Sequence, residues 1–353
     1  MRARLGVVAA LALGVLMAPA ATADWPMFRG DGRNTGDAGK GGEALPAKPE
    51  LLWTFRGGEG FEATPTVAGG RVYTASLDGR LHALDLETGR PRWSKSFEAG
   101  FRASPTVHDG TLYLGDDAGV FHALDAATGE ERWSFATDGE IVSSANLAGG
   151  CVLFGSYDQF LYCLDPQSGK PRWKLETGGP VHASPAVADG LAVVGGCDGL
   201  LRRVRLEDGV ELPPVTLGGY IGASPAVAGG RAYLGTFESE VVALGLADGE
   251  RVWTYSDPKR SFPFYASPAV GPRHVVIAGR DKRVHGIDRA TGRGSWTFAT
   301  RAKVEASPVI AGGRVFAAGE DGVLYGLDLD TGEERWRFEI GDALEASPAV
   351  AAG

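Results

Sequence analysis

The chain has 353 residues, of which 44% are hydrophobic and 22% are charged, and its formal net charge at pH 7 is −9. An acidic chain without interleaved basic and aromatic residues argues against nucleic-acid binding. No stretch is long and apolar enough to span a bilayer, which takes about 20 residues.

The first 23 residues have the pattern of a secretory signal peptide. Arg2 and Arg4 precede an apolar run over residues 5–17, and Ala21 and Ala23 form a small-x-small cleavage site. Cleavage after Ala23 removes both arginines and changes the net charge from −9 to −11. We expect an exported protein, periplasmic or extracellular. No cysteine lies near this site, so a lipid anchor is not expected.

Residues 24–50 are rich in Gly, Lys, Ala and Pro and show no apolar period. We expect an irregular lead-in that lies over the surface of a single domain at residues 51–353.

A unit of about 40 residues recurs through that domain. Its register is marked by tryptophans, and a small-Ser-Pro element and an Asp-x-x-Thr-Gly turn repeat in phase with them. The tryptophans are Trp53, Trp93, Trp133, Trp173, Trp253, Trp296 and Trp336. The small-Ser-Pro element stands at Thr64, Ser104, Ser184, Ser224, Ser267, Ser307 and Ser347, and in a degenerate form at Ser144.

Each unit holds four short runs of β-branched, aromatic and apolar residues divided by Gly-containing turns, which predicts a four-stranded antiparallel meander. Such units fit the blades of an all-β propeller. Eight small-Ser-Pro strands and eight tryptophan-type positions predict eight blades, the last one incomplete in this chain. The leading strand at residues 51–55 is expected to close the last blade.

The tryptophans are interpreted as structural docks between blades, because an indole buries roughly 150 to 250 Å². Blade four lacks this dock, since Pro213 stands at the tryptophan position and Arg205 at the turn aspartate. We expect blade four to be the least stable sector.

The repeat changes length once, at residues 256–265, where a longer segment joins a fourth strand to the next first strand. Repeat proteins tend to add binding functions in such loops. The segment coincides with a basic sector, since residues 259–303 hold ten Lys and Arg against two Asp. This sector could steer an acidic protein or an anionic lipid headgroup, or be a solvated face. The candidate partner surface consists of Lys259, Arg260, Phe262, Phe264, Arg280, Lys282 and Arg283.

Three cysteines cannot all pair. Cys151 and Cys163 flank a hairpin turn near residues 158–159 and are expected on opposite faces of the sheet, which predicts no disulfide. Together with Cys197 they are interpreted as small buried or turn residues.

The residue two positions before each small-Ser-Pro serine or threonine starts the innermost strand at the mouth of the propeller. Polar groups that converge there suit a small molecule or a peptide, although a wet mouth without a ligand is the alternative. Glu305 and Glu345 are neighbours in blade order and could share a cation. The residues of this mouth ring are Glu62, Arg102, Val142, His182, Gly222, Tyr265, Glu305 and Glu345.

The pattern Ala-x-Asp-x-x-Thr-Gly-x-x-x-Trp, with small-Ser-Pro-x-Val between copies, resembles the pyrroloquinoline-quinone (PQQ) type propeller repeat from about residue 51 onward. That family divides into quinoprotein dehydrogenases, which hold the quinone and Ca²⁺ above the channel, and non-catalytic exported propellers. The second branch is typified by BamB, a subunit of the outer-membrane β-barrel assembly machine. The motif Asp-Trp-Pro-Met-Phe-Arg-Gly-Asp at residues 24–31, with Asn34-Thr35-Gly36 behind it, is similar to the start of many exported proteins of the non-catalytic branch. The absent lipid-anchor cysteine departs from BamB.

The resemblance does not extend to a catalytic site. The dehydrogenases carry an adjacent Cys-Cys pair and inserted loops with a catalytic Asp and Ca²⁺ ligands, and no residue here matches them. His82, His122 and His285 share one repeat slot with Tyr162 and Tyr325, which indicates residues that pack within strands.

We therefore expect an exported non-catalytic scaffold, without PQQ or Ca²⁺, that acts as a monomer and binds an envelope protein. By analogy with BamB it would support outer-membrane protein assembly, and pairing of an exposed strand edge with its partner is one way to do so. One alternative is a quinone-dependent or small-ligand enzyme that uses Glu62, Arg102, His182 and Glu305. The other is a polysaccharide-binding propeller with Phe262, Phe264 and Tyr265 as stacking residues.

Overall fold

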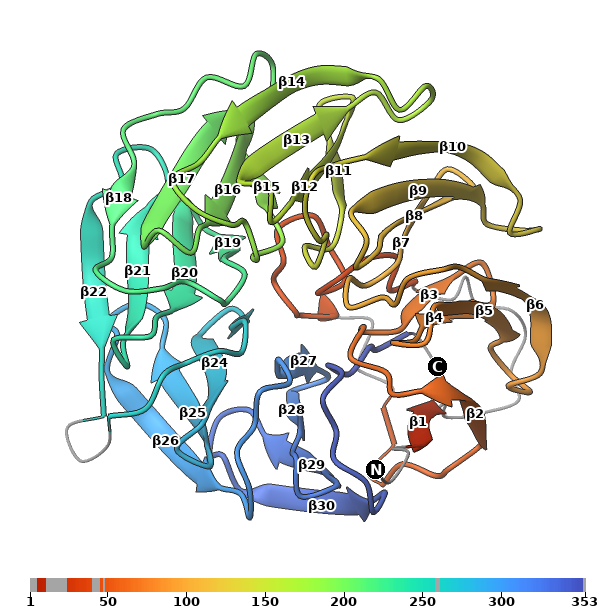
Figure 1. Ribbon diagram of the computed structural model, residues 1–353. Helices are drawn as coiled ribbons and strands as arrows, with labels where there is room; N and C mark the ends of the chain where they lie inside the picture. Colours follow the sequence, from red (N-terminus) through yellow and green to blue (C-terminus); the bar gives the residue numbers. More distant parts are fainter. Residues whose placement is uncertain (1–4, 11–23, 40–44, 47, 258–260, 352–353) are drawn as a thin grey trace.

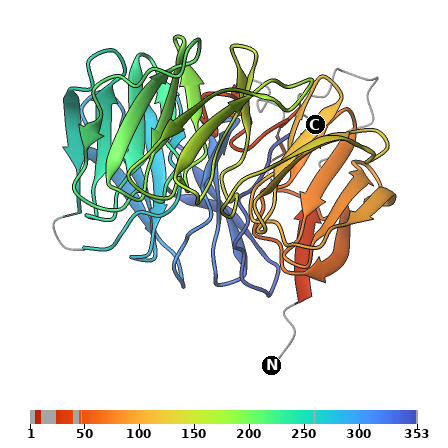
Figure 2. The same cartoon turned by 45° about the horizontal axis from the view of Figure 1, so that its top comes forward.

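The computed structural model describes residues 5–10, 24–39, 45–46, 48–257 and 261–351, and they form a ring of β-sheets around a central axis (Figure 1). Seven four-stranded antiparallel sheets are present in these ranges, each made of strands consecutive in sequence. Figure 2 shows the sheets standing side by side around the ring. None of the described residues belongs to a helix with the length and hydropathy needed to cross a membrane.

Each blade runs from an innermost first strand to an outermost fourth strand. The first strands are β3 (Thr66–Ala68), β7 (Thr106–His108), β11 (Asn146–Ala148), β15 (Ala186–Ala188), β19 (Ala226–Ala228), β23 (Ala269–Val270) and β27 (Val309–Ala311). The second strands are β4 (Arg71–Ala75), β8 (Thr111–Gly115), β12 (Cys151–Gly155), β16 (Leu191–Gly195), β20 (Arg231–Gly235), β24 (His274–Gly279) and β28 (Arg314–Ala318). The third strands are β5 (Arg80–Asp85), β9 (Val120–Asp125), β13 (Phe160–Leu164), β17 (Leu200–Arg205), β21 (Val241–Gly245), β25 (Arg283–Asp288) and β29 (Val323–Asp328). The fourth strands are β6 (Pro91–Ser96), β10 (Glu131–Ala136), β14 (Pro171–Glu176), β18 (Val215–Thr216), β22 (Arg251–Tyr255), β26 (Gly294–Ala299) and β30 (Glu334–Glu339).

The apolar cores lie between neighbouring blades. Tyr73 and Leu81 of the first blade, for example, share a buried cluster with Leu112 and Leu124 of the second. The second and third strands are therefore buried on both faces, whereas the fourth strands alternate between exposed and half-buried residues, as β10 does. A sheet covered on both faces needs nearly continuous apolar runs, and an outer strand needs only alternation.

The prediction of eight blades is wrong, because the described residues form seven. The place between β30 and β3 holds a two-stranded antiparallel sheet of β1 (Leu5–Ala10) and β2 (Trp53–Glu59) instead (Figure 1). Residues 349–351 pack beside Trp53 and Phe55 without forming a strand. The small-Ser-Pro element at Ser347 belongs to no strand among the described residues, so counting these elements gives one more than the number of blades.

The small-Ser-Pro elements link the blades into a ring. Each serine hydroxyl accepts a hydrogen bond from the backbone N–H of the corresponding residue in the preceding unit, and all these groups are buried. The bonds are Thr64 N to Ser104 Oγ (3.0 Å), Ser104 N to Ser144 Oγ (2.9 Å), Ser144 N to Ser184 Oγ (2.8 Å), Ser184 N to Ser224 Oγ (2.9 Å), Ser224 N to Ser267 Oγ (3.0 Å), Ser267 N to Ser307 Oγ (2.9 Å) and Ser307 N to Ser347 Oγ (2.9 Å).

Tryptophans join the outer parts of the blades. The indoles of six of these tryptophans, all but Trp336, lie over the glycine of the next blade's turn between third and fourth strands, where a Cβ atom would collide with the ring, as at Gly129 beneath Trp93. The same glycines have positive φ, 77° at Gly129, so the turn needs glycine for two reasons. The indole N–H donates to a backbone carbonyl of that turn at Trp53–Leu86 (2.9 Å), Trp93–Ala126 (3.2 Å), Trp133–Pro166 (3.0 Å), Trp173–Leu206 (2.9 Å), Trp253–Arg289 (3.0 Å) and Trp296–Leu329 (2.9 Å).

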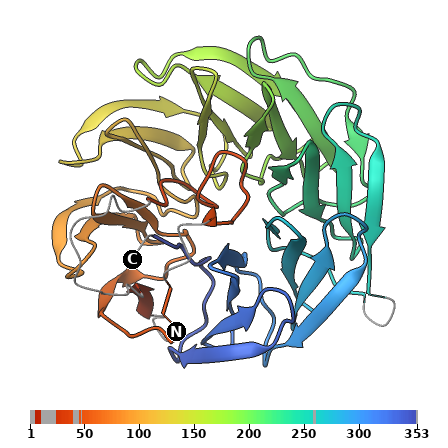
Figure 3. The ribbon, with the colours of Figure 1, turned by 180° about the vertical axis from the view of Figure 1, so that it is seen from behind.

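Residues 24–38 form a segment, called here the N-terminal plug, that runs across the centre of the ring (Figure 3). Its backbone carbonyls accept hydrogen bonds from the first strand of each of the seven blades. The donors are the backbone N–H groups of Val67, Val107, Val187, Val227, Val270 and Ile310, and the side-chain amide of Asn146. The first strands end at this side of the ring, so the plug lies opposite the mouth ring. The sequence predicted a lead-in over the surface, and residues 24–38 lie instead against the innermost strands.

Two buried side chains of the plug explain its motif. The Arg29 guanidinium donates to the carbonyl oxygens of Pro268 (3.1 Å) and Pro308 (2.6 Å), and its burial lowers its pKa to about 9. The Asn34 amide donates to the carbonyls of Ser184 and Pro225 at 3.2 and 3.3 Å. Both residues have positive φ, 62° and 55°. The plug is therefore shaped for its site by specific residues.

The prediction that Cys151 and Cys163 cannot pair is wrong, because they form a disulfide with a Cα–Cα distance of 5.1 Å. Cys163 lies directly opposite Leu153 in the β12–β13 hairpin, and Cys151 is two residues from Leu153. Residues two apart in a strand share a face, so the register places both sulfurs on one side of the sheet. The sequence argument failed because it misjudged this register.

Candidate functional site

The mouth ring residues lie a few positions before the first strand of each blade. Arg102 is the centre of one sector, with its guanidinium 3.7 Å from the Glu62 carboxylate and 3.2 Å from that of Glu140. Asp117 also approaches Arg102, at 3.5 Å. The structure therefore brings two predicted ring residues together and adds two carboxylates that the ring definition did not include.

This sector carries more negative than positive charge. Burial, followed by the charge of Glu345, raises the pKa of Glu62, and Arg102 opposes this shift. Burial likewise raises the pKa of Asp117, again against Arg102. One arginine is shared among several carboxylates, so Arg102 already has internal partners.

His182 is the centre of a second sector, which is uncharged at neutral pH. The Tyr157 hydroxyl lies 2.7 Å from its Nδ1 atom and the Tyr265 hydroxyl 3.1 Å from its Nε2 atom. A neutral imidazole has one N–H and one acceptor nitrogen, so one tyrosine accepts its proton and the other donates to it. Burial, aided by the charge of Arg102, lowers the pKa of His182 to about 4.

A third sector is held by ion pairs. The Arg280 guanidinium lies 5.3 Å from the centre of the Tyr265 ring and pairs with Glu305 at 2.5 Å. Lys303 bridges Glu305 and Glu320, at 2.9 Å from each. Two cationic side chains therefore contact Glu305 directly.

Apart from Glu140, the mouth residues missed by the ring definition share one repeat slot. They follow the ring residues by 15 positions, in the turn between second and third strands. In most blades their backbone N–H group bonds to the entering segment, as Tyr157 does to Glu140. A search for a second in-phase position would have found them. They are Leu77, Asp117, Tyr157, Cys197, Phe237, Arg280 and Glu320.

The candidate partner surface is only partly accessible. Lys259 and Arg260 lie outside the described residues. Phe262 is 47% exposed, but Phe264 is 3% exposed and packs in the core between blades five and six. Lys282 is exposed, whereas Arg283 donates to the Thr297 hydroxyl at 2.9 Å. Burial of Phe264 also removes one of the three aromatic residues predicted to stack on a glycan.

The fold and the repeat together define the class of the protein as a PQQ-like repeat propeller. The sequence profile of the family described as outer membrane protein assembly factor BamB matches residues 46–146, 138–261 and 237–352. The chain belongs to this family. An outer membrane protein assembly factor BamB from Aliivibrio fischeri is 36% identical over 67 residues, which cover 16% of this chain and 17% of that protein.

Solved structures from both branches, the BamB proteins and the quinone-dependent dehydrogenases, share the fold of this chain. BamB from Moraxella catarrhalis superposes with a TM-score of 0.72 at 20% identity, over 82% of this chain and 88% of that one. A quinohemoprotein alcohol dehydrogenase from Comamonas testosteroni gives a TM-score of 0.79 at 16% identity, over 93% and 74%. A europium-containing methanol dehydrogenase gives 0.76 at 14% identity, over 92% and 87%. At these identities the similarity concerns the fold alone, and function has to be argued from the site.

Proposed function

We propose that the protein is an exported, non-catalytic propeller that binds another envelope protein and supports outer-membrane protein assembly. The observation that carries the proposal is the family match over residues 46–352, which takes in all seven blades. The relative from Aliivibrio fischeri and the structure from Moraxella catarrhalis carry the same description.

Three further observations support export and a binding role. The Cys151–Cys163 disulfide suits an oxidising compartment such as the periplasm. The charged side chains of the mouth are held in ion pairs, Arg102 with Glu62 and Arg280 with Glu305, which is the arrangement of a rigid surface. The three cysteines are also not adjacent, unlike the pair expected of a quinoprotein dehydrogenase.

The partner would meet the face that carries the mouth ring and residues 256–265. Phe262 and Lys282 are exposed there, and the surrounding sector is basic, so an acidic partner surface fits best. Arg280 is less suited to partner contact because it already contacts Glu305 and Tyr265.

The test is a cross-linked pulldown from envelope extract with the full-length exported protein and a Phe262→Ala/Lys282→Glu variant. We expect the wild type to capture a component of the β-barrel assembly machinery and the variant to lose most of it. The matched control is Arg293→Glu, which makes the same charge change at an exposed position in the turn between β25 and β26, on the plug side of the ring. Loss in both variants would refute the assigned face, and capture of no assembly component by the wild type would refute the assembly role.

A second candidate is a small ligand at the mouth, favoured by the partly buried, hydrogen-bonded trio of Tyr157, His182 and Tyr265. An absorbance titration with quinone and Ca²⁺, combined with alcohol-dependent dye reduction, tests it directly. Turnover that disappears in Glu62→Ala would replace the scaffold proposal with this one.

A further inference from the structure

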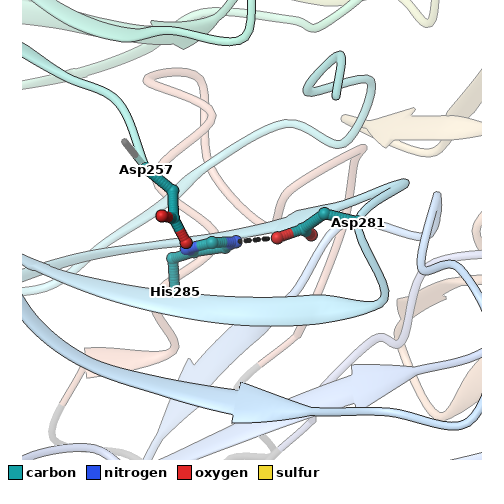
Figure 4. A group of neighbouring side chains, drawn as sticks. All are labelled: Asp257, Asp281 and His285. Atoms are coloured by element: carbon teal, nitrogen blue, oxygen red, sulfur yellow. Dashed lines mark hydrogen bonds and ion pairs between the residues drawn. The ribbon is translucent and has the colours of Figure 1, made fainter. Parts of the chain in front are cut away.

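Three potential metal ligands converge between blades five and six. They are Asp257, which follows β22, Asp281, in the turn before β25, and His285, within β25. One carboxylate oxygen of each aspartate and one imidazole nitrogen of His285 all lie within 4.8 Å of one another. Figure 4 shows Asp281 on the side of the ring where it bonds to Nε2, at 3.1 Å, and Asp257 toward the other end of the ring.

Part of this group is a structural feature of the repeat. An aspartate in the same turn contacts the residue four positions later in other blades, at Asp158–Tyr162 (2.7 Å), Asp198–Arg202 (3.0 Å) and Asp321–Tyr325 (2.5 Å). The Asp281–His285 pair alone therefore requires no ligand. The added element is Asp257, which belongs to the lengthened segment at residues 256–265.

Blade two provides an internal comparison. His122 also has two carboxylate neighbours, one at each nitrogen: Asp116 is 3.1 Å from Nε2 and Glu131 is 3.1 Å from Nδ1. What distinguishes the blade-six position, among the described residues, is that ligand atoms of two carboxylates and one imidazole all lie within 4.8 Å of one another.

The position is largely buried. His285 is fully buried and Asp281 is 5% exposed. The Tyr255 hydroxyl lies 3.0 Å from His285 Nδ1. Two carboxylates held close together in a partly desolvated site repel each other, and a bound cation offsets this repulsion.

We propose that Asp257, Asp281 and His285 bind a divalent transition-metal ion and thereby link Asp257, just after the last strand of blade five, to blade six. Two carboxylates and one imidazole form a donor set that Zn²⁺ and Mn²⁺ accept, and three protein ligands leave positions for water. The proposal goes beyond the assembly role and does not depend on it.

The test is calorimetric titration of chelator-treated full-length protein with ZnCl₂ and, separately, with MnCl₂. We expect one ion to bind per chain, with an affinity at least about tenfold weaker in Asp257→Asn because a ligand is lost. Asp257 is the residue to change because it is half-buried at the edge of the site, whereas a substitution of buried His285 also disturbs the core. Glu131→Gln, which alters the comparable histidine in blade two, is the matched control and should bind as the wild type does.

A second measurement separates this site from adventitious surface binding. The metal should raise the unfolding temperature of the wild type and of Glu131→Gln but not that of Asp257→Asn. Without metal, the three proteins should show the same circular dichroism spectrum. The proposal is overturned if neither ion binds saturably, or if Asp257→Asn binds with unchanged affinity.

Discussion

The guanidinium group of Arg203 donates to the carbonyl oxygen of Leu246 over 3.1 Å, at the junction where other blades use an indole. Arg203 also donates to Ala247 (2.8 Å) and Pro213 (2.9 Å), and it lies over Gly249 as each tryptophan lies over its glycine. Blade four thus lacks the tryptophan, but an arginine makes the equivalent contact with the next blade. This arginine lies in the third strand, whereas the tryptophans lie in the fourth.

Arg203→Ala should destabilise the protein by about 3 kcal/mol, because buried carbonyls lose a charged donor. The measurement is the free energy of unfolding in urea. Arg205→Ala is the control: its ion pair with Asp208 is exposed, and such pairs contribute at most about 1 kcal/mol. Equal effects of the two substitutions would show that Arg203 does not replace the indole.

Blade four should nevertheless exchange its amide hydrogens fastest. Its fourth strand, β18, has two residues where β14 has six, so fewer backbone hydrogen bonds protect that edge. Hydrogen-exchange mass spectrometry of peptides from β17 and β18, compared with β13 and β14, measures this. Slower exchange in β17 and β18 would contradict the prediction.

Removal of the plug's buried contacts should weaken the whole ring. Arg29→Ala is expected to lower the free energy of unfolding by roughly 2 to 4 kcal/mol, since two hydrogen bonds from a charged group are lost. Arg33→Ala changes a neighbouring exposed arginine of the same segment and should have little effect. The comparison is made by denaturant titration, and similar losses in both variants would argue against a specific role for Arg29.

The disulfide should contribute about 3 kcal/mol, because it closes a short loop whose ends are 12 residues apart in sequence. Denaturant titration with and without a reductant measures this, and Cys151→Ala/Cys163→Ala should match the reduced wild type. Cys197→Ala is the control, since Cys197 is not part of the bond. A reductant effect of similar size in Cys151→Ala/Cys163→Ala would mean that the disulfide is not its origin.

Acidification should destabilise the fold through His182. Its pKa is about 4 in the folded protein and about 6.5 in an unfolded chain, so below pH 6.5 the unfolded state binds the extra proton. Stability is therefore complete above pH 6.5 and falls toward pH 4, by about 2 kcal/mol between pH 7.5 and pH 5.

His182→Gln should lose that component of the pH dependence, while the exposed His108→Gln keeps it. Glu62 and Asp117 have raised pKa values and act in the opposite direction, but they are present in both variants. Identical pH profiles for the wild type and His182→Gln would exclude His182 as the cause.

The repeat made the blade architecture predictable, because Ser-Pro elements, glycine turns and tryptophans each perform one local task that recurs every 40 residues or so. Features that depend on long-range contacts were not predictable. The plug lacks any apolar period, and nothing near Arg29 in sequence indicates that its partners are Pro268 and Pro308. The disulfide was missed for a local reason, since one step of register decides whether two side chains share a face.

The candidate sites were predictable to a lesser degree. In-phase counting found Glu62, Arg102 and Tyr265 at the mouth, but it could not reveal which neighbouring side chains they contact. Phe264 illustrates the limit within the lengthened segment: a phenylalanine two positions from exposed Phe262 is buried in the core. The approach of Asp257 to Asp281 and His285 depends on the path of that segment, which spacing alone does not determine.

The contacts of Arg29 impose an order in which parts of the chain can fold. Arg29 binds carbonyls 239 and 279 residues further along the chain, on the sixth and seventh blades. Those carbonyls are correctly spaced only after both blades have formed and come together. Contacts between such distant residues carry a large entropic cost until the intervening chain is ordered. Arg29 therefore reaches its final contacts only after blades six and seven have formed, and a ribosome or translocase that releases the chain slowly leaves its guanidinium without these two carbonyls until residue 308 has emerged.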